Sequence, residues 1–561
     1  MYAKFVCLFF VVWLREKVKV GNRHINHFIR LIHIIKKNVV FCISVTGVLI
    51  LHLFFAWQPL NRLEGFRLLT SNGPLMDDSY IFFKISRDLA DWLSGAIPSL
   101  QLTSGFQPLI AFLYFPFFQL FWYQKEFPIH LALSLNALLG FFAHILLYCL
   151  LRKIVNRSIA TFLVSIWIWS PYVMYQSING METTLALLLL LITLHYYWRI
   201  NHLSHHQFRS WFVLGLLLGI GFWARVDLGM LGVAIVIDQT WLAIQGDRYS
   251  RSLRLKDILL CSLTALVVAS PWMIFIIINT GNLLPISGRA VRQVTNVVFN
   301  HLYLNHSGFS LMMLARFKRE LLIYQPLIAL SKHISWKLCI SGLSTVGLIL
   351  AVRDRQLRIL FRPILIFQFL ILASYIIIIG GAWHLNRYLY PVYTLMLFLH
   401  ASTLRYLELR IKLRPLIVAI MLFILCIPYA FSYTAQYHFQ WSQNLPARYL
   451  SAALFAKDRI PPKAKVGTFQ SGCLSYWLDN QVINLDGVLN KEAYFHLQNK
   501  TMDVYLDEQK IDYLVEEVFL FRMWDNYLGG QLSKHYSMVA SKTEKLLRRG
   551  WNKLGIYKRK P

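Results

Sequence analysis

The sequence is short of charged residues, and of acidic ones above all. Only 15% of its 561 residues are charged, and 27 aspartates and glutamates stand against 57 lysines and arginines, for a formal net charge of +30. Apolar residues make up 57%, and the mean hydropathy is +0.48. Apolar runs of helix-spanning length recur along most of the chain, which excludes a soluble multidomain protein. We therefore predict a polytopic α-helical membrane protein.

Cysteine is also scarce. Six of the seven cysteines lie in or near apolar segments, and only Cys473 falls in the polar C-terminal region. No CxxC pair or other metal-ligand spacing occurs, and a single cysteine excludes a disulfide within that region. Internal repeats and low-complexity tracts are absent as well.

The basic residues are grouped in short clusters between apolar segments rather than along one groove, which argues against a nucleic-acid partner. Eleven apolar segments are candidate spans, namely 38–57, 129–151, 158–176, 181–199, 211–224, 227–245, 257–278, 334–352, 361–380, 388–403 and 415–432. Six basic clusters lie between or before them, at 15–37, 152–157, 199–209, 247–256, 353–362 and 405–414. With a cytoplasmic N-terminus, all six fall on the cytoplasmic side, as the positive-inside rule requires. The pattern predicts a multi-pass protein of the plasma (inner) membrane.

The segment 107–123 is apolar enough to count as a further span. Counting it would place the next basic cluster outside and invert every later one, and it contains Pro108 and Pro116. We therefore expect it to lie in the outer interface or to re-enter the membrane.

Three regions follow from these assignments. Residues 1–37 form a basic cytoplasmic N-terminus, and residues 38–432 a transmembrane domain whose first outer loop is 58–128. From residue 433 onward, β-like runs such as KVGTF, QVINLDG and IDYLVEE alternate with helical ones, between glycine and proline punctuation. Residues 433–561 are therefore expected to form a small extracytoplasmic α/β domain.

The stretch MDDSYIFFKISRDLADWLSG places Asp77 and Asp78 side by side at the start of an amphipathic helix. Apolar and charged residues separate onto two faces from Tyr80 to Ser94, so this helix is expected to lie flat on the outer surface. Asp78 or Ser79 could simply cap the helix. One carboxylate is enough for a cap, however, and two neighbours raise a pKa or require a cation. An acid/base or metal site is the alternative.

Other outer loops place charges at the ends of spans. Glu182, in SINGMETT, is either a helix N-terminal charge or a functional acid. Arg225 and Asp227, in FWARVDLG, interrupt an apolar run. Because a buried charge pair so close in sequence is unfavourable in lipid, we expect a break at the outer boundary, with Arg225 a candidate ligand for an anion.

Two later outer loops contain cations. NLLPISGRAVR carries Arg289 and Arg292, and GGAWHLNRYLYP carries His384 and Arg387. The second loop could also be an aromatic belt with a snorkelling arginine, and a lone histidine is more often structural than a ligand. All the candidate acids and cations nevertheless project to one side of the membrane: Asp77, Asp78, Glu182, Arg225, Arg289, His384 and Arg387.

In order along the chain, these motifs resemble the GT-C superfamily of integral-membrane glycosyltransferases. The relevant signals are MDDSY, TSGFQPL, SINGMETT, ARVD, SGRA, RYLYP and the tail with VGTF and VINLDG. The nearest branches are relatives of the protein O-mannosyltransferases, the aminoarabinose transferase of lipid A and the mycobacterial arabinofuranosyltransferases. The likeness covers roughly residues 38 to 520. ARVD lacks the proline common in that turn, and no motif names the acceptor.

The resemblance implies transfer of a hexosyl or pentosyl group from a polyprenyl-phosphate sugar to an extracytoplasmic glycan, lipid or protein. Asp77 and Asp78 would supply the general base, and Glu182 would be the second acid or a metal candidate. Arg225, Arg289, His384 and Arg387 would hold the donor phosphate, and a divalent cation could assist. A single displacement would invert the anomeric carbon.

Two other functions fit a multi-pass protein with outer polar loops. A transporter or flippase of lipid-linked saccharides usually has charges or helix breaks near the bilayer midplane, whereas here the polar motifs gather at one face. A non-catalytic assembly subunit is the third possibility, against which the intact acidic residues argue.

Overall fold

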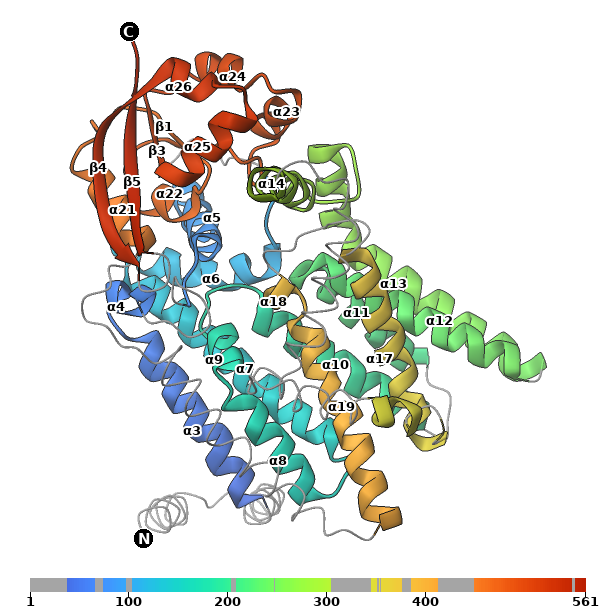
Figure 1. Ribbon diagram of the computed structural model, residues 1–561. Helices are drawn as coiled ribbons and strands as arrows, with labels where there is room; N and C mark the ends of the chain where they lie inside the picture. Colours follow the sequence, from blue (N-terminus) through green and yellow to red (C-terminus); the bar gives the residue numbers. More distant parts are fainter. Residues whose placement is uncertain are drawn as a thin grey trace, which may run out of the picture.

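The computed structural model describes residues 38–65, 74–96, 103–202, 208–246, 248–303, 345–350, 353, 355–375, 385–411, 448–546 and 550–561. A bundle of long helices occupies one end of the molecule, and an α/β unit built from the C-terminal residues covers the other (Figure 1). Between them lie three helices that do not belong to the bundle: α5 (Asp77–Leu93), α6 (Pro108–Leu120) and α14 (Ile286–Tyr303).

Five helical segments of the described chain are long and apolar enough to cross a membrane, which agrees with a polytopic membrane protein. These are α3 (Val39–Ala56), α7 (Phe127–Leu151), α10 (Thr183–His202), the segment Val226–Gln245, formed by η1 (Val226–Leu228) with α12 (Gly229–Gln245), and α13 (Arg248–Thr280). Shorter helices complete the bundle, namely α8 (Arg157–Ile168), α9 (Pro171–Ser177), α11 (Phe208–Ala224), α17 (Arg355–Ser374), α19 (Tyr390–Tyr406) and η3 (Leu407–Ile411).

One predicted span is interrupted. Residues 158–176 were expected as a single helix, but the chain breaks at Trp169 and Ser170 into α8 and α9. The Ser170 hydroxyl accepts a hydrogen bond from the Val173 N–H, and Pro171 occupies the first position of α9. Proline is favoured there and cannot continue a preceding helix, so the sequence starts a new helix. Span 415–432 and most of span 334–352 lie outside the described residues.

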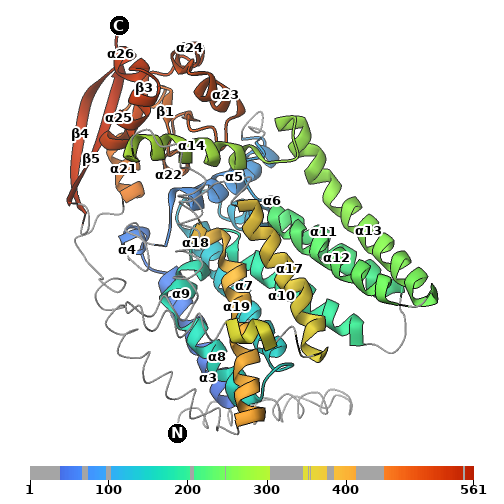
Figure 2. The same cartoon turned by 45° about the vertical axis from the view of Figure 1, so that its right-hand side comes forward.

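Helix α6 falls within the apolar segment 107–123. Its 13 residues extend about 20 Å, short of the roughly 30 Å of a bilayer core. It packs against α5 and α7 at the end of the bundle that faces the α/β unit (Figure 2).

The C-terminal unit contains a five-stranded sheet of order β2-β1-β3-β5-β4. β1 (Val466–Thr468) runs parallel to β2 (Val482–Asn484) and β3 (Tyr513–Glu517), whereas β5 (Gly550–Arg559) is antiparallel to β3 and to β4 (Tyr536–Leu546). The helices of the unit are α21 (Arg448–Lys457), α22 (Gly472–Trp477), α23 (Lys491–Asn499), α24 (Met502–Glu508), α25 (Val518–Tyr527) and α26 (Gln531–His535). The first three strands coincide with the three β-like runs of the sequence.

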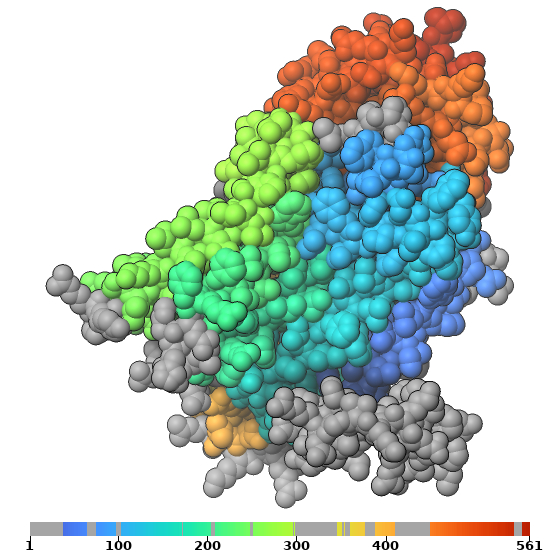
Figure 3. Space-filling model, turned by 180° about the vertical axis from the view of Figure 1, so that it is seen from behind, coloured from blue at the N-terminus to red at the C-terminus, as the bar shows by residue number. Residues whose placement is uncertain are grey.

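The α/β unit is packed directly onto the end of the bundle. Tyr80 and Phe83 of α5 share one buried apolar cluster with Cys473 and Tyr476 of α22. Seen from behind, the orange C-terminal residues lie on the blue and light-green segments (Figure 3). The two parts therefore position each other's loops.

Candidate active site

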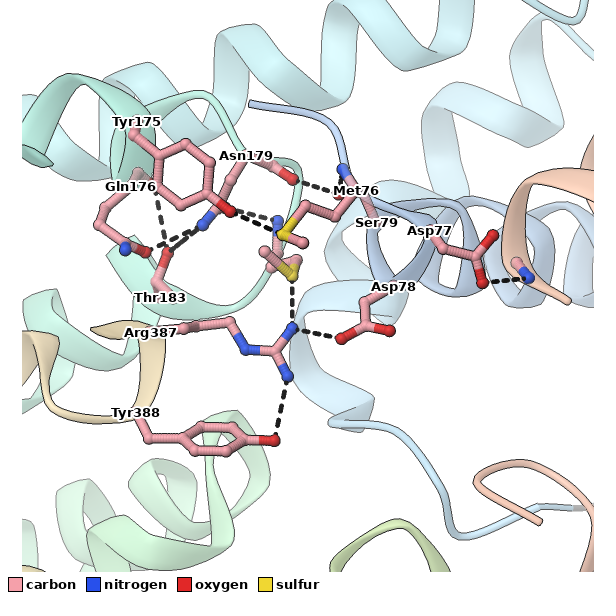
Figure 4. A network of polar contacts seen from close by, with 12 residues as sticks. Met76, Asp77, Asp78, Ser79, Tyr175, Gln176, Asn179, Thr183, Arg387 and Tyr388 are labelled. Carbon is pink, nitrogen blue, oxygen red and sulfur yellow. Dashed lines mark hydrogen bonds and ion pairs between the residues drawn. The ribbon is translucent and has the colours of Figure 1, made fainter. Parts of the chain in front are cut away.

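The two aspartates that open α5 point in different directions (Figure 4). Helix α5 begins at Asp77, so Met76 holds the cap position, and the Ser79 hydroxyl accepts a hydrogen bond from the Met76 N–H at 3.0 Å. The same hydroxyl donates to the backbone oxygen of Asn179 at 2.6 Å. The interpretation of Asp78 as a cap is therefore wrong, and Ser79 fills that role.

Asp77 points toward the C-terminal unit. Its carboxylate accepts hydrogen bonds from the backbone N–H groups of Gly472, at 2.9 Å, and Cys473, at 2.8 Å. Its side chain is buried, and a Cβ on Gly472 would lie 2.0 Å from the backbone oxygen of Asp77. The carboxylate thus binds the start of α22, where free N–H groups favour a negative charge.

Asp78 points toward the bundle and forms an ion pair with Arg387 of α18 (Leu385–Tyr388), Nη1 to Oδ2, at 2.8 Å. Its side chain is 33% exposed, so it is open to an incoming molecule. Arg387 also donates to the Tyr388 hydroxyl at 3.3 Å and to the Met181 sulfur at 2.7 Å. Arg387 Nε is buried without a hydrogen-bond partner among the described residues.

The SINGMETT segment fixes the position of this pair. Asn179 accepts from the Met181 N–H at 2.9 Å and donates to the Gln176 side chain at 3.0 Å. Gly180 has a φ of +69°, and a Cβ there would lie 2.6 Å from the Phe83 ring. Only glycine fits such a left-handed turn against α5.

Glu182 lies in the same region, 3% exposed. It is close enough to Arg225, Arg387 and Tyr388 to act on each of them electrostatically. Its Oε2 atom is buried and has no hydrogen-bond partner within the part of the chain that the structure describes. An acceptor atom of this kind is available to a bound ligand.

Arg225 lies between α11 and η1, 2% exposed. It forms an ion pair with Asp227 and donates to the Tyr375 hydroxyl at 3.2 Å and to the Tyr388 backbone oxygen at 3.3 Å. The expected helix break is present, and the charge pair beside it is buried among protein side chains. Tyr375, which donates to Asp227 at 2.7 Å, helps to satisfy the buried charges.

The Tyr388 ring joins the two arginines. It lies 5.0 Å from the Arg387 guanidinium carbon and 5.9 Å from that of Arg225, and it stacks on Tyr375 at 4.9 Å. Arg225 Nη1 is a second buried donor without a partner among the described residues. Two arginines that each keep a free N–H are suited to an oxyanion such as a phosphate.

One predicted donor ligand, Arg289, is not part of this cluster. Arg289, on α14, packs over the rings of Tyr494, at 5.1 Å, and Phe495, at 5.9 Å. Through these cation–π contacts, Arg289 holds α14 against α23. His384 lies outside the described residues.

The sequence analysis missed Asp486, which follows β2. Burial, with the negative charges of Asp77 and Asp78 nearby, raises the pKa of this carboxyl to about 7. It lies in the VINLDG motif, which served for the family resemblance and as a strand followed by a turn, but not as a source of a site carboxyl. Tyr375 and Tyr388 were missed as well, because nothing in the sequence links them to Arg225.

The arrangement brings an accessible carboxylate and two buried cations together at one end of the bundle. Such a site can take a proton from a hydroxyl and stabilise a phosphate that carries developing charge. No three histidine, cysteine, aspartate or glutamate side chains in the described residues are grouped so that they could hold a metal ion.

Known proteins resemble this chain in sequence and in fold. Residues 107–275 match the family described as dolichyl-phosphate-mannose-protein mannosyltransferase, and residues 433–557 match a domain of unknown function. None of the curated proteins is significantly similar in sequence.

Among solved structures, ArnT from Cupriavidus metallidurans bound to undecaprenyl phosphate is similar over 92% of this chain and 97% of its own, with a TM-score of 0.51 at 14% identity. Its apo state gives 0.50 at 13% identity, over the same shares of both chains. The archaeal oligosaccharyltransferase AglB from Archaeoglobus fulgidus, in complex with an inhibitory peptide and a dolichol-phosphate, gives 0.49 at 12% identity, over 88% of this chain and 72% of its own.

Proposed function

From the premise that this chain has the fold of the GT-C superfamily, as its motifs predicted, we propose that it is a membrane glycosyltransferase. It transfers a sugar from a polyprenyl-phosphate donor to an extracytoplasmic acceptor, which is a glycan, a lipid or a protein. The observation that carries the proposal is the cluster of Asp78, Arg387, Arg225 and Glu182 at one end of the bundle. The family match, and the undecaprenyl phosphate named for the ArnT structure, support a donor of this class.

Asp78 is the general base in this mechanism. It accepts the proton of the acceptor hydroxyl while the hydroxyl oxygen forms a bond to the anomeric carbon of the donor sugar. The bond from that carbon to the phosphate oxygen breaks, and the polyprenyl phosphate leaves with the bonding electrons. Arg387 and Arg225 stabilise the charge that develops on the phosphate. One displacement of this kind inverts the anomeric centre.

Asp77 is assigned a different role. Both of its oxygens accept backbone N–H bonds from the start of α22, which favours the ionised form and makes the group a poor base. Asp77 therefore holds the C-terminal unit against α5, and Asp78 is left for the chemistry.

Glu182 is the second acid. Its buried Oε2 lacks a partner in the described chain, and its charge opposes those of both arginines. It fits the role of a group that fixes the arginines or binds a hydroxyl of the donor sugar.

The test compares asparagine variants of the two aspartates. Asp78→Asn removes the base without changing the shape of the side chain, and transfer should fall by a factor on the order of 100 or more. Purified wild-type or variant protein is added to membranes from cells that lack the gene. Mass spectrometry then measures how much of the lipid-linked sugar in these membranes is consumed. Asp91→Asn, at the far end of the same helix, is the matched control and should retain wild-type transfer.

Three outcomes are distinct. Loss of transfer in Asp78→Asn, with normal expression, supports the assignment of the base. Wild-type transfer in Asp78→Asn would mean that Asp77 and Asp78 both have a structural role. If the wild-type protein leaves the lipid-linked sugars of these membranes unchanged, the glycosyltransferase proposal itself is wrong.

A further inference from the structure

The guanidinium of Arg225 is held by one of its two terminal nitrogens. Nη2 donates to three acceptors, which are the Asp227 carboxylate, the Tyr375 hydroxyl at 3.2 Å and the Tyr388 backbone oxygen at 3.3 Å. Because the guanidinium is planar and rigid, bonds to Nη2 also fix the direction of Nη1. Nη1 is buried and has no hydrogen-bond partner among the described residues. One end of the group is therefore anchored in the protein, and the other end is left for a ligand.

Tyr375 connects the two members of this ion pair. Its hydroxyl accepts from Arg225 Nη2 and donates to Asp227 Oδ2 at 2.7 Å, so its proton and a lone pair are both used. The residue is 4% exposed, and its ring stacks on Tyr388 at 4.9 Å. By donating to Asp227, the hydroxyl also offsets part of the negative charge next to the arginine. Tyr375 thus orients Arg225 and limits the repulsion that Asp227 would exert on a bound anion.

The backbone at Arg225 is restricted as well. Arg225 is extended, between the end of α11 and the start of η1. The N–H of the next residue, Val226, donates to the Gln107 side chain at 3.4 Å. Gln107 belongs to the TSGFQPL motif and Asp227 to the ARVD motif. Neither Gln107 nor Asp227 has a task in the proposed mechanism, and both restrict the position of Arg225.

Arg225 and Arg387 share their surroundings. The Tyr388 ring lies 5.9 Å from the guanidinium carbon of Arg225 and 5.0 Å from that of Arg387. Glu182 is close enough to act on both arginines electrostatically. An oxyanion bound to Nη1 of Arg225 would therefore also be attracted by the second arginine.

We propose that Tyr375 is a positioning residue which, together with Asp227, orients Arg225 toward the phosphate of the polyprenyl-phosphate donor. This inference rests on the proposed glycosyltransferase function and concerns recognition of the phosphate, not of the sugar or of the lipid tail. With Nη2 held by the protein, Nη1 donates to a phosphate oxygen without a prior rotation of the side chain. A group that is already oriented loses less conformational entropy when the phosphate binds.

The experiment measures lipid binding to the purified full-length protein in one detergent. The probes are undecaprenyl phosphate and undecaprenol, which has the same tail without the phosphate. Tyr375→Phe removes the hydroxyl and keeps the ring that stacks on Tyr388. Its affinity for undecaprenyl phosphate should fall about tenfold, because Arg225 loses one of the bonds that orient it. Its affinity for undecaprenol should equal that of the wild type, because no phosphate is recognised.

Tyr390→Phe is the matched control. Tyr390 is a fully buried tyrosine at the start of α19, and its hydroxyl has no hydrogen-bond partner in the described part of the chain. Removal of this hydroxyl should leave the affinity for both probes at the wild-type value. Thermal unfolding of the same samples shows whether either variant has lost stability.

A double-mutant cycle tests whether Tyr375 acts through Arg225. Arg225→Lys keeps the charge but lacks the second arm of the guanidinium, so it should also bind undecaprenyl phosphate less tightly. In the Arg225→Lys protein, Tyr375→Phe should then weaken binding little further, because no guanidinium remains to be oriented. Independent effects of the two substitutions, which would multiply, contradict the positioning role.

The remaining outcomes separate this role from the proposed function. Wild-type affinity of Tyr375→Phe for undecaprenyl phosphate, or an equal loss of affinity for undecaprenol, would overturn the role of Tyr375 alone. If the wild-type protein binds undecaprenyl phosphate no more tightly than undecaprenol, the donor class in the proposed function is wrong, and the role of Tyr375 is wrong with it.

Discussion

Adjacent residues can have unrelated tasks when each contacts a different part of the chain. Asp77 binds α22, 395 residues later in sequence, and Asp78 binds Arg387, 309 residues later. The sequence indicated that the pair was unusual, because two like charges side by side are unfavourable. It could not indicate which aspartate is accessible, since that depends on contacts across several hundred residues.

For Arg387, the sequence allowed two different interpretations, a ligand of the donor phosphate or an arginine in an aromatic belt. It could have been a snorkelling arginine in an aromatic belt, but it is largely buried and paired with Asp78. Removing one partner of a buried pair leaves an uncompensated charge, and removing Arg387 would also remove a ligand that we propose for the donor phosphate.

We expect Arg387→Ala to reduce transfer by a factor on the order of 100 and to weaken undecaprenyl phosphate binding. Arg387→Lys keeps the charge but not the planar fork, so it should recover only part of the activity. Transfer and binding are measured on the same purified protein. Arg62→Ala, an exposed arginine on α4 (Leu60–Gly65), is the matched control. Normal transfer in the Arg387 alanine variant would favour the aromatic-belt interpretation.

At the scale of single elements, the contact between α5 and α22 determines whether the C-terminal unit can pack against the helix bundle. Gly472 allows the backbone of α22 to approach Asp77, and the Asp77 carboxylate then reaches both N–H groups. A methyl group at this position would contact the Asp77 backbone oxygen, which cannot move like the end of a flexible side chain.

Gly472→Ala should therefore separate α22 from α5. We expect a loss of stability of about 1–3 kcal/mol at this contact, with faster proteolysis of the C-terminal unit and reduced transfer. Gly288→Ala is the control, because a Cβ on Gly288 meets nothing within 4 Å and alanine is favoured in a helix. Equal proteolysis rates for the two variants would contradict the role of this contact.

The elements themselves were predicted to different degrees. β1, β2 and β3 were recognisable as short apolar runs between turn residues. β4 and β5 were not, because they carry many polar and basic side chains and are held largely by pairing with each other.

Asp238, in the apolar helix α12, was also missed as a buried charge. It pairs with Arg362 of α17 and with Tyr197 of α10, so its partners are remote in sequence.

For the whole molecule, the positive-inside pattern and the site lead to the same orientation. The candidate site, α14 and the C-terminal unit gather at one end of the bundle, whereas the basic turn between α12 and α13 lies away from them (Figure 2). We propose that the first end is extracytoplasmic and that the N-terminus is cytoplasmic. A polyprenyl-phosphate donor keeps its tail in the bilayer, so its phosphate reaches only a site at the membrane boundary.

Reporter fusions test this orientation. Each reporter replaces the chain after one position, and its activity shows the side on which that position lies. We expect the cytoplasmic side after positions 155, 204, 251, 357 and 409, because each lies in or beside a basic cluster. We expect the opposite side after positions 125, 180, 300 and 450.

The decisive measurement is the side reported at position 125, which follows α6, because α7 separates positions 125 and 155 whether or not α6 crosses. If α6 does not cross, position 125 should report the outside and position 155 the cytoplasm. A cytoplasmic signal at position 125 would mean that α6 crosses the membrane in spite of its 13 residues. In that case Asp78 and Glu182 would lie on opposite sides of the membrane. Their positions do not allow this, because Asp78 is paired with Arg387 and Glu182 is close enough to act on the same arginine electrostatically. The reporters therefore test the site as well as the topology, since Asp78, Glu182 and Arg387 can come together only if α6 stays at the outer boundary.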